Sequence, residues 1–276
     1  MKTLLISDPV RYSRMTTQEL RDSFLISQSS GVGQIRLTYV DLDRAVVGMA
    51  IPTDKPLSLE TSPELRSAFF TERRELGALN IGGEGIVHVG NDSYPVQNLD
   101  LVYIGRGNPD IKFESKSQNS PAVFYILSYP AHVPYPVAVV KKECAQPTEL
   151  GELTRCNRRT VYKYIHAGGA KSCQLVMGVT HLHDGSIWNT MPPHTHMRRS
   201  EVYFYFDISG DQRVFHLMGP PNETKHIVVA DREVVISPGW SIHSGAGTQA
   251  YKFCWGMGGE NQDYADMDPV RIEDML

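Results

Sequence analysis

The chain has 276 residues, of which 27 are Lys or Arg and 31 are Asp or Glu, so its formal net charge is −4. With 41% hydrophobic residues it has the composition of a soluble globular protein, long enough for one large domain or two smaller ones. Consecutive basic residues occur only as pairs such as Arg73-Arg74, which argues against nucleic-acid binding. No apolar run approaches the roughly 18 residues of a membrane span.

Two features of the sequence predict a cytoplasmic location. The first residues contain only three consecutive apolar positions, Leu4-Leu5-Ile6, which is too short for the core of a secretion signal. The four cysteines form no C-x-x-C pair, and a disulfide framework is not expected in a chain of this length. We therefore expect a reduced protein that acts inside the cell and not at a membrane.

Two short helices are predicted in the first third of the chain. The stretch Thr16-Thr17-Gln18-Glu19 has the form of a capping box, and Leu20 and Phe24 follow it at helical spacing. Further along, Ser62-Pro63 offers a cap and a first-turn proline, which predicts a second helix over Glu64–Leu76.

Most of the remaining chain consists of short β-rich segments between Gly, Pro, Asn and Asp residues. Such a pattern favours a sandwich or a barrel over alternating strands and helices. The predicted strands are Gly85–Val89, Leu101–Ile104, Val123–Leu127, Gln174–Thr180, Val202–Phe206, Val214–Met218, His226–Ala230, Val234–Ser237 and Tyr251–Trp255.

A weak internal repeat suggests two β-barrels of similar build. Arg73-Arg74-Glu75 and Arg198-Arg199-Ser200-Glu201 each open a segment of strands and glycine turns, 125 positions apart. The proline-rich stretch Tyr129–Pro136 and the polar segment after it would join the two. We predict an N-terminal arm with a short helix at 1–28, one barrel at 29–135 and a second barrel at 136–276.

The clearest chemical signal is His194-Thr195-His196 followed by Glu201. Residues two apart in a strand share a face, so both imidazoles can point to one spot, and a turn at 197–200 would let Glu201 face them from the next strand. His243, at the end of a segment that begins at Pro238, is the best candidate for a fourth ligand. Imidazole and carboxylate suit zinc, iron, manganese or nickel, and four such ligands leave room for water or substrate.

Other histidines are interpreted as ordinary polar residues. His181-Leu182-His183 has the same spacing as the first pair, but the fifth position after His183 is Trp188 and not a carboxylate. The remaining histidines are isolated in the sequence; they are His88, His132, His166, His216 and His226.

The pattern H-x-H-x4-E followed by P-x4-H resembles the two metal-binding motifs of cupins. It departs from the general motif in two ways: eight residues separate Gly185 from His194, and Trp240 stands where glycine is usual. With these two departures, the pattern resembles the motifs of one cupin subgroup, the 5-keto-4-deoxyuronate isomerase family. Further stretches similar to that family are Ile187–Pro192, Glu201–Phe206, Trp240–Gly245, Trp255–Met257, Gly259–Gln262, Glu72–Gly77 and Asn157–Thr160.

This resemblance implies a mainly β fold of two cupin-type (jelly-roll) barrels with a few short helices, in which only the C-terminal barrel binds metal. It implies one zinc ion per subunit, held by His194, His196, Glu201 and His243, although other divalent metals also suit these ligands. It further implies a cytoplasmic homohexamer that interconverts 5-dehydro-4-deoxy-D-glucuronate and 3-deoxy-D-glycero-2,5-hexodiulosonate in the breakdown of pectin and related polyuronides. The only small-molecule partner expected is the uronate.

A ketol isomerisation of a uronate also needs a group that binds carboxylate and a base. Arg158, Arg159 and Lys163 are candidates for the first role, with Arg159 and Lys163 preferred and a solvated basic turn as the alternative. Arg198-Arg199 are interpreted as structural, because the same pair occurs at Arg73-Arg74. Glu260 or a metal-bound hydroxide could be the base, and the sequence does not decide between them.

Three other functions are compatible with this pattern. The first is a 5-deoxyglucuronate isomerase of inositol catabolism, which has a similar metal site. The second is an iron-dependent cupin dioxygenase, and the third is a sugar-binding cupin without catalytic activity. Assays on both uronates, oxygen consumption and metal analysis would distinguish them.

Overall fold

The computed structural model, which describes residues 1–27 and 31–276, divides the chain into two units that interleave along the sequence. Unit 1 comprises Met1–Leu4, Gln28–Ala145 and Tyr164–Val176, and unit 2 comprises Leu5–Ser27, Gln146–Lys163 and Met177–Leu276. The domain boundaries expected from the sequence, 1–28, 29–135 and 136–276, run consecutively and stay a prediction. The first of them, between residues 28 and 29, lies outside the described residues.

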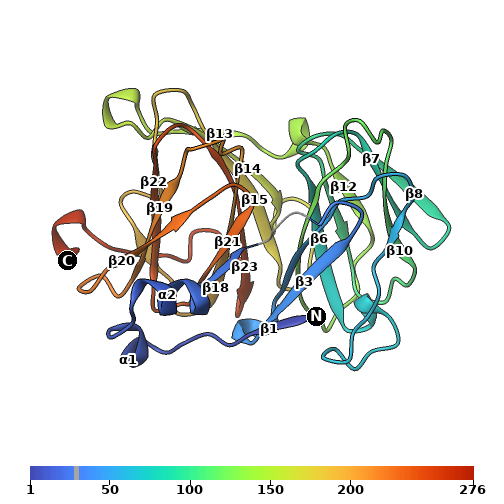
Figure 1. Cartoon of the computed structure of the whole chain (residues 1–276), viewed down its shortest axis with the longest axis horizontal. Coiled ribbons are helices and arrows are strands. Elements are labelled where there is room, and N and C mark those ends of the chain that lie inside the picture. The colour runs from blue at the N-terminus through green and yellow to red at the C-terminus, as the bar shows by residue number, and fades with distance from the viewer. Residues whose placement is uncertain (28–30) are drawn as a thin grey trace. The chain divides into compact units, whose positions relative to one another are not determined.

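Unit 1 contains a seven-stranded and a four-stranded sheet (Figure 1). In spatial order the larger sheet is β1 (Lys2–Leu4), β3 (Ile35–Val40), β4 (Val46–Ala50), β11 (Phe124–Pro130), β6 (Arg74–Asn80), β9 (Leu101–Ile104) and β12 (Ala138–Val140). The smaller is β5 (Leu57–Ser58), β10 (Ile111–Ser115), β7 (Gly85–Val89) and β8 (Asp92–Val96). Alternate residues of both sheets, such as Leu76 on β6 and Phe113 on β10, form one apolar core.

Unit 2 contains most of a second pair of sheets, again one of seven strands and one of four. The larger is β13 (Thr148–Leu150), β14 (Arg159–Ile165), β15 (Val176–Leu182), β23 (Lys252–Gly259), β18 (Arg199–Phe206), β21 (Glu233–Ser237) and β2 (Leu25–Ser27). The smaller is β16 (Trp188–Asn189), β22 (Ile242–Gly247), β19 (Val214–Gly219) and β20 (Lys225–Val229). Two short strands, β17 (His194–Thr195) and β24 (Asp268–Pro269), pair with each other.

The matching sheet orders support the repeat expected from the sequence. Both arginine pairs stand at the start of a central strand, since β6 begins at Arg74 and β18 begins at Arg199. In unit 1 β6 pairs with β11 and β9, and in unit 2 β18 pairs with β23 and β21.

The α-helices are confined to the N-terminal part of unit 2 within the described residues. They are α1 (Pro9–Tyr12) and α2 (Thr17–Phe24), and α2 lies beside β20 and β21 (Figure 1). The predicted capping box is confirmed, because Thr16 and Glu19 bond reciprocally at the start of α2. Single 3-10 turns are η1 (Leu42–Arg44), η2 (Phe70–Glu72), η3 (Lys142–Cys144), η4 (Leu153–Arg155) and η5 (Ile272–Asp274).

The predicted helix over Glu64–Leu76 is wrong. The segment contains turns, the 3-10 turn η2, and then the beginning of β6 at Arg74. Every residue of β6 is buried between two neighbouring strands, so pairing with β11 and β9 outweighs the local helix signal at Ser62-Pro63.

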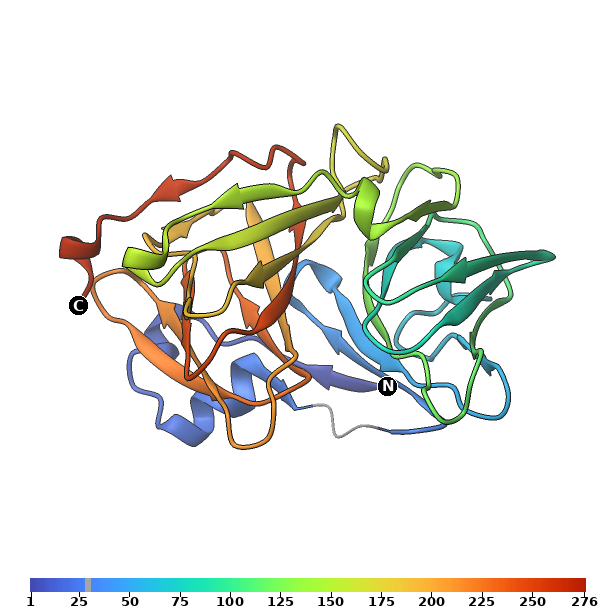
Figure 2. The ribbon, with the colours of Figure 1, turned by 90° about the horizontal axis from the view of Figure 1, so that it is seen from above.

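The strand predictions are confirmed in position, with ends that differ by a few residues. Gly85–Val89 and Leu101–Ile104 coincide with β7 and β9. After β23 the chain leaves the sheet, and Figure 2 shows this last segment, in red, running along the outside of unit 2. Within the described residues no helix has the length and apolar character needed to cross a membrane, and all four cysteines are free.

Candidate metal centre

Three strands of unit 2 bring together the four residues that the sequence predicted as ligands. His194 lies on β17, His196 directly follows it, Glu201 lies on β18 and His243 lies on β22. The expected turn between the second histidine and the glutamate is confirmed, because the chain turns at Met197-Arg198 before β18 begins. One ligand atom from each of the four residues lies within 4.8 Å of all the others.

The ring nitrogens and the carboxylate converge on one point. Glu201 Oε2 lies 2.9 Å from His196 Nε2 and 2.9 Å from His243 Nε2, and the Nε2 atoms of His243 and His194 are also 2.9 Å apart. When both rings are neutral, the two Nε2 atoms of His194 and His243 can have at most one proton between them. At least one of these nitrogens therefore has a free lone pair that can bind a cation. A set of three imidazoles and one carboxylate suits a divalent cation, and the residues therefore fit a metal.

Burial and mutual charge explain how these groups titrate in the absence of a cation. Burial, and then the neighbouring His243, lower the pKa of His194 to about 3. Burial opposes the ionisation of Glu201, yet the adjacent imidazoles of His243 and His196 hold the pKa of this carboxyl well below its usual range. The cluster therefore holds an ionised, buried carboxylate and a neutral His194, both of which are the forms that bind a cation.

Hydrogen bonds behind the ligands fix which ring nitrogen faces the centre. His196 donates from Nδ1 to the carbonyl oxygen of Arg199 at 2.8 Å, which leaves Nε2 for the cation. His243 Nδ1 lies 3.2 Å from Ser237 Oγ on the neighbouring strand β21.

A cavity of about 250 Å³ opens beside the cluster. Its polar lining consists of His194 and Glu201 together with Arg159, Thr180, Thr190, Tyr203 and Tyr264, and its apolar lining includes Val161, Phe253, Trp255, Met257 and Met267. Its size is below the usual range of sites for drug-sized ligands, and it suits a small molecule with a few polar groups.

The three residues predicted to bind the substrate carboxylate lie in different surroundings. Arg159 on β14 lines the cavity, and burial lowers the pKa of its guanidinium. Lys163 places its Nζ 4.9 Å from the centre of the Tyr264 ring and is not among the described cavity residues. Arg158 is half exposed, and its Nε lies 4.0 Å from a carboxylate oxygen of Glu149. Of the three, only Arg159 shares the cavity with the cluster.

Glu260 is not among the described residues that line the cavity. Its side chain is exposed, and its backbone N–H donates to the carbonyl oxygen of Arg198 at 3.0 Å. The geometry therefore gives no support to Glu260 as a base.

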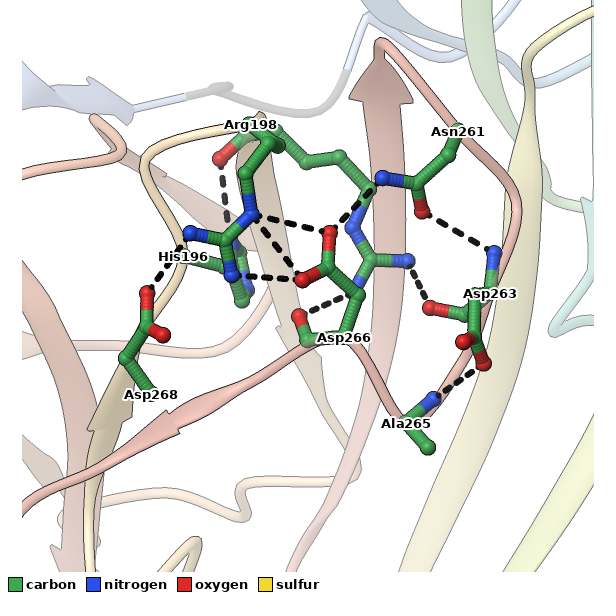
Figure 3. A network of polar contacts seen from close by, with 8 residues as sticks. His196, Arg198, Asn261, Asp263, Ala265, Asp266 and Asp268 are labelled. Carbon is green, nitrogen blue, oxygen red and sulfur yellow. Dashed lines mark hydrogen bonds and ion pairs between the residues drawn. The ribbon is translucent and has the colours of Figure 1, made fainter.

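Arg198 bonds the segment that follows β23 (Figure 3), and Arg199 bonds both this segment and His196. Arg198 donates three hydrogen bonds of 2.5–3.1 Å to the carboxylate of Asp266 and one of 3.0 Å to Asp268. Arg199 is buried and donates to the backbone carbonyls of Asp263 and Asp266 at 2.6 and 2.7 Å. The structural role predicted for this pair is thus the attachment of residues 263–268.

Hydroxyl groups near the cluster were not predicted as site residues. Tyr203 is buried two residues after Glu201 on the same face of β18, and its hydroxyl lies 3.2 Å from Thr190 Oγ1. Thr190 has a φ of 47°, an unusual value for a β-branched residue. Strand alternation from Glu201 indicates Tyr203, whereas nothing local in the sequence indicates Thr190.

His216 is also buried in this region, although the sequence suggested an ordinary residue. Its Nδ1 bonds the Tyr205 hydroxyl at 2.7 Å, its Nε2 has no partner within the described residues, and burial lowers its pKa to about 3. Another buried polar contact of unit 2 is the hydrogen bond that Asn189 Nδ2 donates to the Tyr251 hydroxyl at 2.6 Å.

The second H-x-H pattern takes part in different contacts. His183 Nε2 lies 2.8 Å from Thr160 Oγ1 and 3.2 Å from Glu149 Oε2, and its ring stacks on His181. The one group of metal-ligating side chains found within residues 1–27 and 31–276 contains neither of these histidines.

Comparison with known proteins agrees with this geometry. The model of the KduI/IolB family matches residues 25–272. The chain is 49% identical to a 4-deoxy-L-threo-5-hexosulose-uronate ketol-isomerase of Opitutus terrae and 47% identical to one of Halalkalibacterium halodurans, over the full length of both partners in each case. An IolB-like protein of Salmonella typhimurium LT2 shares the fold with a TM-score of 0.72 at 14% identity, over 90% of this chain and 96% of its own.

Proposed function

The chain belongs to the KduI/IolB family, and we propose that it is a metal-dependent ketol-isomerase that converts 5-dehydro-4-deoxy-D-glucuronate to 3-deoxy-D-glycero-2,5-hexodiulosonate. The observation that carries this proposal is one cavity lined by Arg159 and by two members of the His194–His196–Glu201–His243 cluster, His194 and Glu201. Full-length identity of 49% to a named uronate ketol-isomerase supports this substrate over 5-deoxyglucuronate.

The reaction moves a proton from one carbon to its neighbour while a carbonyl and a hydroxyl group exchange places. A bound cation supplies Lewis-acid stabilisation of the negative charge that develops on these oxygens. The four ligands would hold the cation, and Tyr203 and Thr190, whose hydroxyl oxygens are 3.2 Å apart, line the same cavity as His194 and Glu201. These hydroxyls can donate hydrogen bonds to substrate oxygens and fix which carbon faces the cation.

Arg159 is the best group in the cavity to bind the carboxylate of the substrate. One of its terminal nitrogens donates to the backbone carbonyl of Asn157 at 2.8 Å, and it forms no ion pair with any described carboxylate. A half-buried guanidinium without a counter-charge gains most from an anionic ligand, and its fork matches the two oxygens of a carboxylate.

We propose zinc as the cation, with one ion per subunit. The donor set supports any of several divalent metals, and zinc follows from the family resemblance. The homohexamer, the cytoplasmic location and the place in pectin or other polyuronide breakdown belong to the same proposal.

The test is metal analysis of the purified protein paired with turnover of the unsaturated uronate monomer. We expect zinc close to one equivalent per subunit and ketol isomerisation that a chelator abolishes and zinc restores. Turnover of 5-deoxyglucuronate alone would refute the proposed substrate. Oxygen consumption with bound iron would indicate a dioxygenase, and sugar binding without turnover would indicate a non-catalytic cupin.

A further inference from the structure

Part of the cavity wall comes from a segment outside the sheets. Tyr264 and Met267 line the cavity beside His194 and Glu201, yet they belong to residues 260–270, here named the C-terminal strap. The strap contains only two strand residues, Asp268 and Pro269. Its position therefore depends on bonds to other parts of unit 2 and not on its own secondary structure.

Those bonds reach the segment that carries two of the four ligands. At one end of the strap the N–H of Glu260 donates to the carbonyl of Arg198, and at the other end the N–H of Val270 donates to the carbonyl of Pro193, both at 3.0 Å. In between, β24 pairs with β17, so His194 lies opposite Pro269. Residues 193–198 thus bind the strap along its length.

Among the described residues, Arg198 makes the largest number of side-chain hydrogen bonds to the strap, and its neighbour Arg199 adds bonds to the backbone carbonyls of Asp263 and Asp266. Three of the Arg198 hydrogen bonds go to Asp266 and one goes to Asp268, and Asn261 donates a further bond of 2.7 Å to the Asp266 carboxylate (Figure 3). Fork-shaped guanidinium–carboxylate pairs are the strongest and most directional hydrogen bonds between side chains. Asp266 lies two residues from Tyr264, so this pair fixes the part of the strap that faces the cavity.

The ring of Tyr264 is packed in a defined orientation. Its centre lies 5.4 Å from that of Trp255, which also lines the cavity, and the Lys163 ammonium lies over it. Within the described residues the Tyr264 hydroxyl forms no hydrogen bond. The contacts with Trp255 and Lys163 hold the ring where Tyr264 lines the cavity.

We propose that Arg198 is a positioning residue that holds the strap in place, so that Tyr264 closes the cavity and restricts the site to single sugar acids. The inference rests on the proposed function, because it assigns the cavity to a uronate. A cavity of about 250 Å³ with Tyr264 and Met267 in its wall has room for one small molecule. A chain of two uronates would need to displace the strap.

The first test compares Arg198→Ala with Arg271→Ala in the zinc-loaded protein. Arg271 is a matched control, since it makes two 2.8 Å hydrogen bonds to Asp274 and an ion pair with Glu273, is exposed and does not line the cavity. In Arg198→Ala we expect hydrogen exchange over residues 260–270 and the KM for the uronate each to rise about tenfold, with kcat changed less than about threefold and the zinc content unchanged. Arg271→Ala should leave all four values as in the wild type.

Further variants keep the test decisive if Arg198→Ala does not fold. Asp266→Asn should match the effect of Arg198→Ala, and Asp268→Asn should have a smaller effect because it accepts one hydrogen bond instead of three. Wild-type exchange rates and KM in Arg198→Ala and Asp266→Asn would overturn the proposal. Loss of zinc together with the rise in KM would also overturn it, because Arg198 would then act on the ligands and not on the strap.

The second test measures specificity with two competitive inhibitors, D-galacturonate and digalacturonate. We expect the wild type to bind the monomer far better than the dimer, and Tyr264→Ala to reduce this preference at least about tenfold, while Tyr264→Phe retains it. An unchanged preference in Tyr264→Ala would refute the specificity role. If the wild type does not turn over the uronate, the proposed function fails, and the exchange comparison still decides whether Arg198 holds the strap.

Discussion

The two units have the same sheet order but differ in what fills the space between their sheets. In unit 1 this space contains Leu76, Phe113, Phe124 and other apolar side chains of one continuous core. In unit 2 it contains histidines, tyrosines and Glu201 beside a cavity. At the 125-residue spacing of the repeat, Leu76 is the counterpart of Glu201. The same framework thus supports either an apolar core or a reactive site, depending on a few inward positions.

The arginine pairs show which part of the repeat is structural. Arg74 and Arg199 are both buried and both donate to backbone carbonyls. Their neighbours differ, since Arg73 bonds the carbonyl of Arg66 whereas Arg198 binds the carboxylates of the strap. The carbonyls that Arg74 binds belong to Arg44 and Ser128, whereas those that Arg199 binds belong to the strap, so in unit 2 both arginines of the pair contact residues 263–268.

The largest expected effect comes from removing a ligand in unit 2. His243→Ala should lose zinc and lower turnover at least about a thousandfold, because Lewis-acid assistance worth several kcal/mol disappears. Metal analysis and the isomerase assay measure both effects. His183→Ala is the control and should retain both, and full turnover in zinc-free His243→Ala would refute the site.

Truncation in unit 1 should affect stability and leave the chemistry intact. Leu76→Ala removes a fully buried side chain from the apolar core and should cost about 2–5 kcal/mol of unfolding free energy. Urea unfolding gives the free energy, and kcat per folded molecule should match the wild type. A loss of turnover in the folded variant would show that the interior of unit 1 serves catalysis.

Arg159→Met should weaken substrate binding in unit 2 while the cation stays bound. Loss of a charged hydrogen-bonding partner should raise the KM for the uronate by about 10- to 100-fold. Arg158→Met tests the neighbouring arginine, which is half exposed, and should change KM little. Equal effects of the two substitutions would point to general charge attraction instead of a specific contact.

Acid should act on unit 2 before unit 1 in the zinc-free protein. The pKa of His216 is about 3 in the folded state against 6.5 as its ordinary value, so between these pH values the unfolded chain binds the extra proton. Stability is therefore lost as the pH falls from about 6.5 towards 3, by up to about 1.4 kcal/mol per pH unit for this group. In His216→Gln the slope of unfolding free energy against pH should be smaller, whereas an unchanged slope would assign the acid sensitivity to other groups.

Local patterns were sufficient to predict much of the fold and the cluster. The capping box at Thr16 and Glu19 depends on contacts three residues apart, and strand alternation is visible in any six residues. His194, His196 and Glu201 lie within eight positions, so strand geometry and one turn already bring them together. The prediction of His243 as a ligand depended on a second motif, which begins at Pro238.

Features that depend on distant contacts were not predictable in this way. The segment 64–76 has a helix start signal, but the neighbouring strands β11 and β9 determine its structure. Tyr264 lines the cavity on a segment that is attached by residues far from it in sequence, among them Arg198 through Asp266. A single sequence also gives no sign that Arg198 and Arg73 have different partners, because the two pairs look alike.

The pairing of β17 with β24 also has a consequence for the order of folding. The bond from Arg198 to Asp268 closes a loop of 70 residues, and the contact of His194 with His243 closes one of 49. Closing long loops costs chain entropy before any contact repays it, so these pairings form late, after the local hairpins. A divalent cation that binds the assembled ligands would stabilise the native state by mass action. Refolding experiments should therefore show activity returning after the bulk of the β-structure, at a rate that reports the docking of the C-terminal strap.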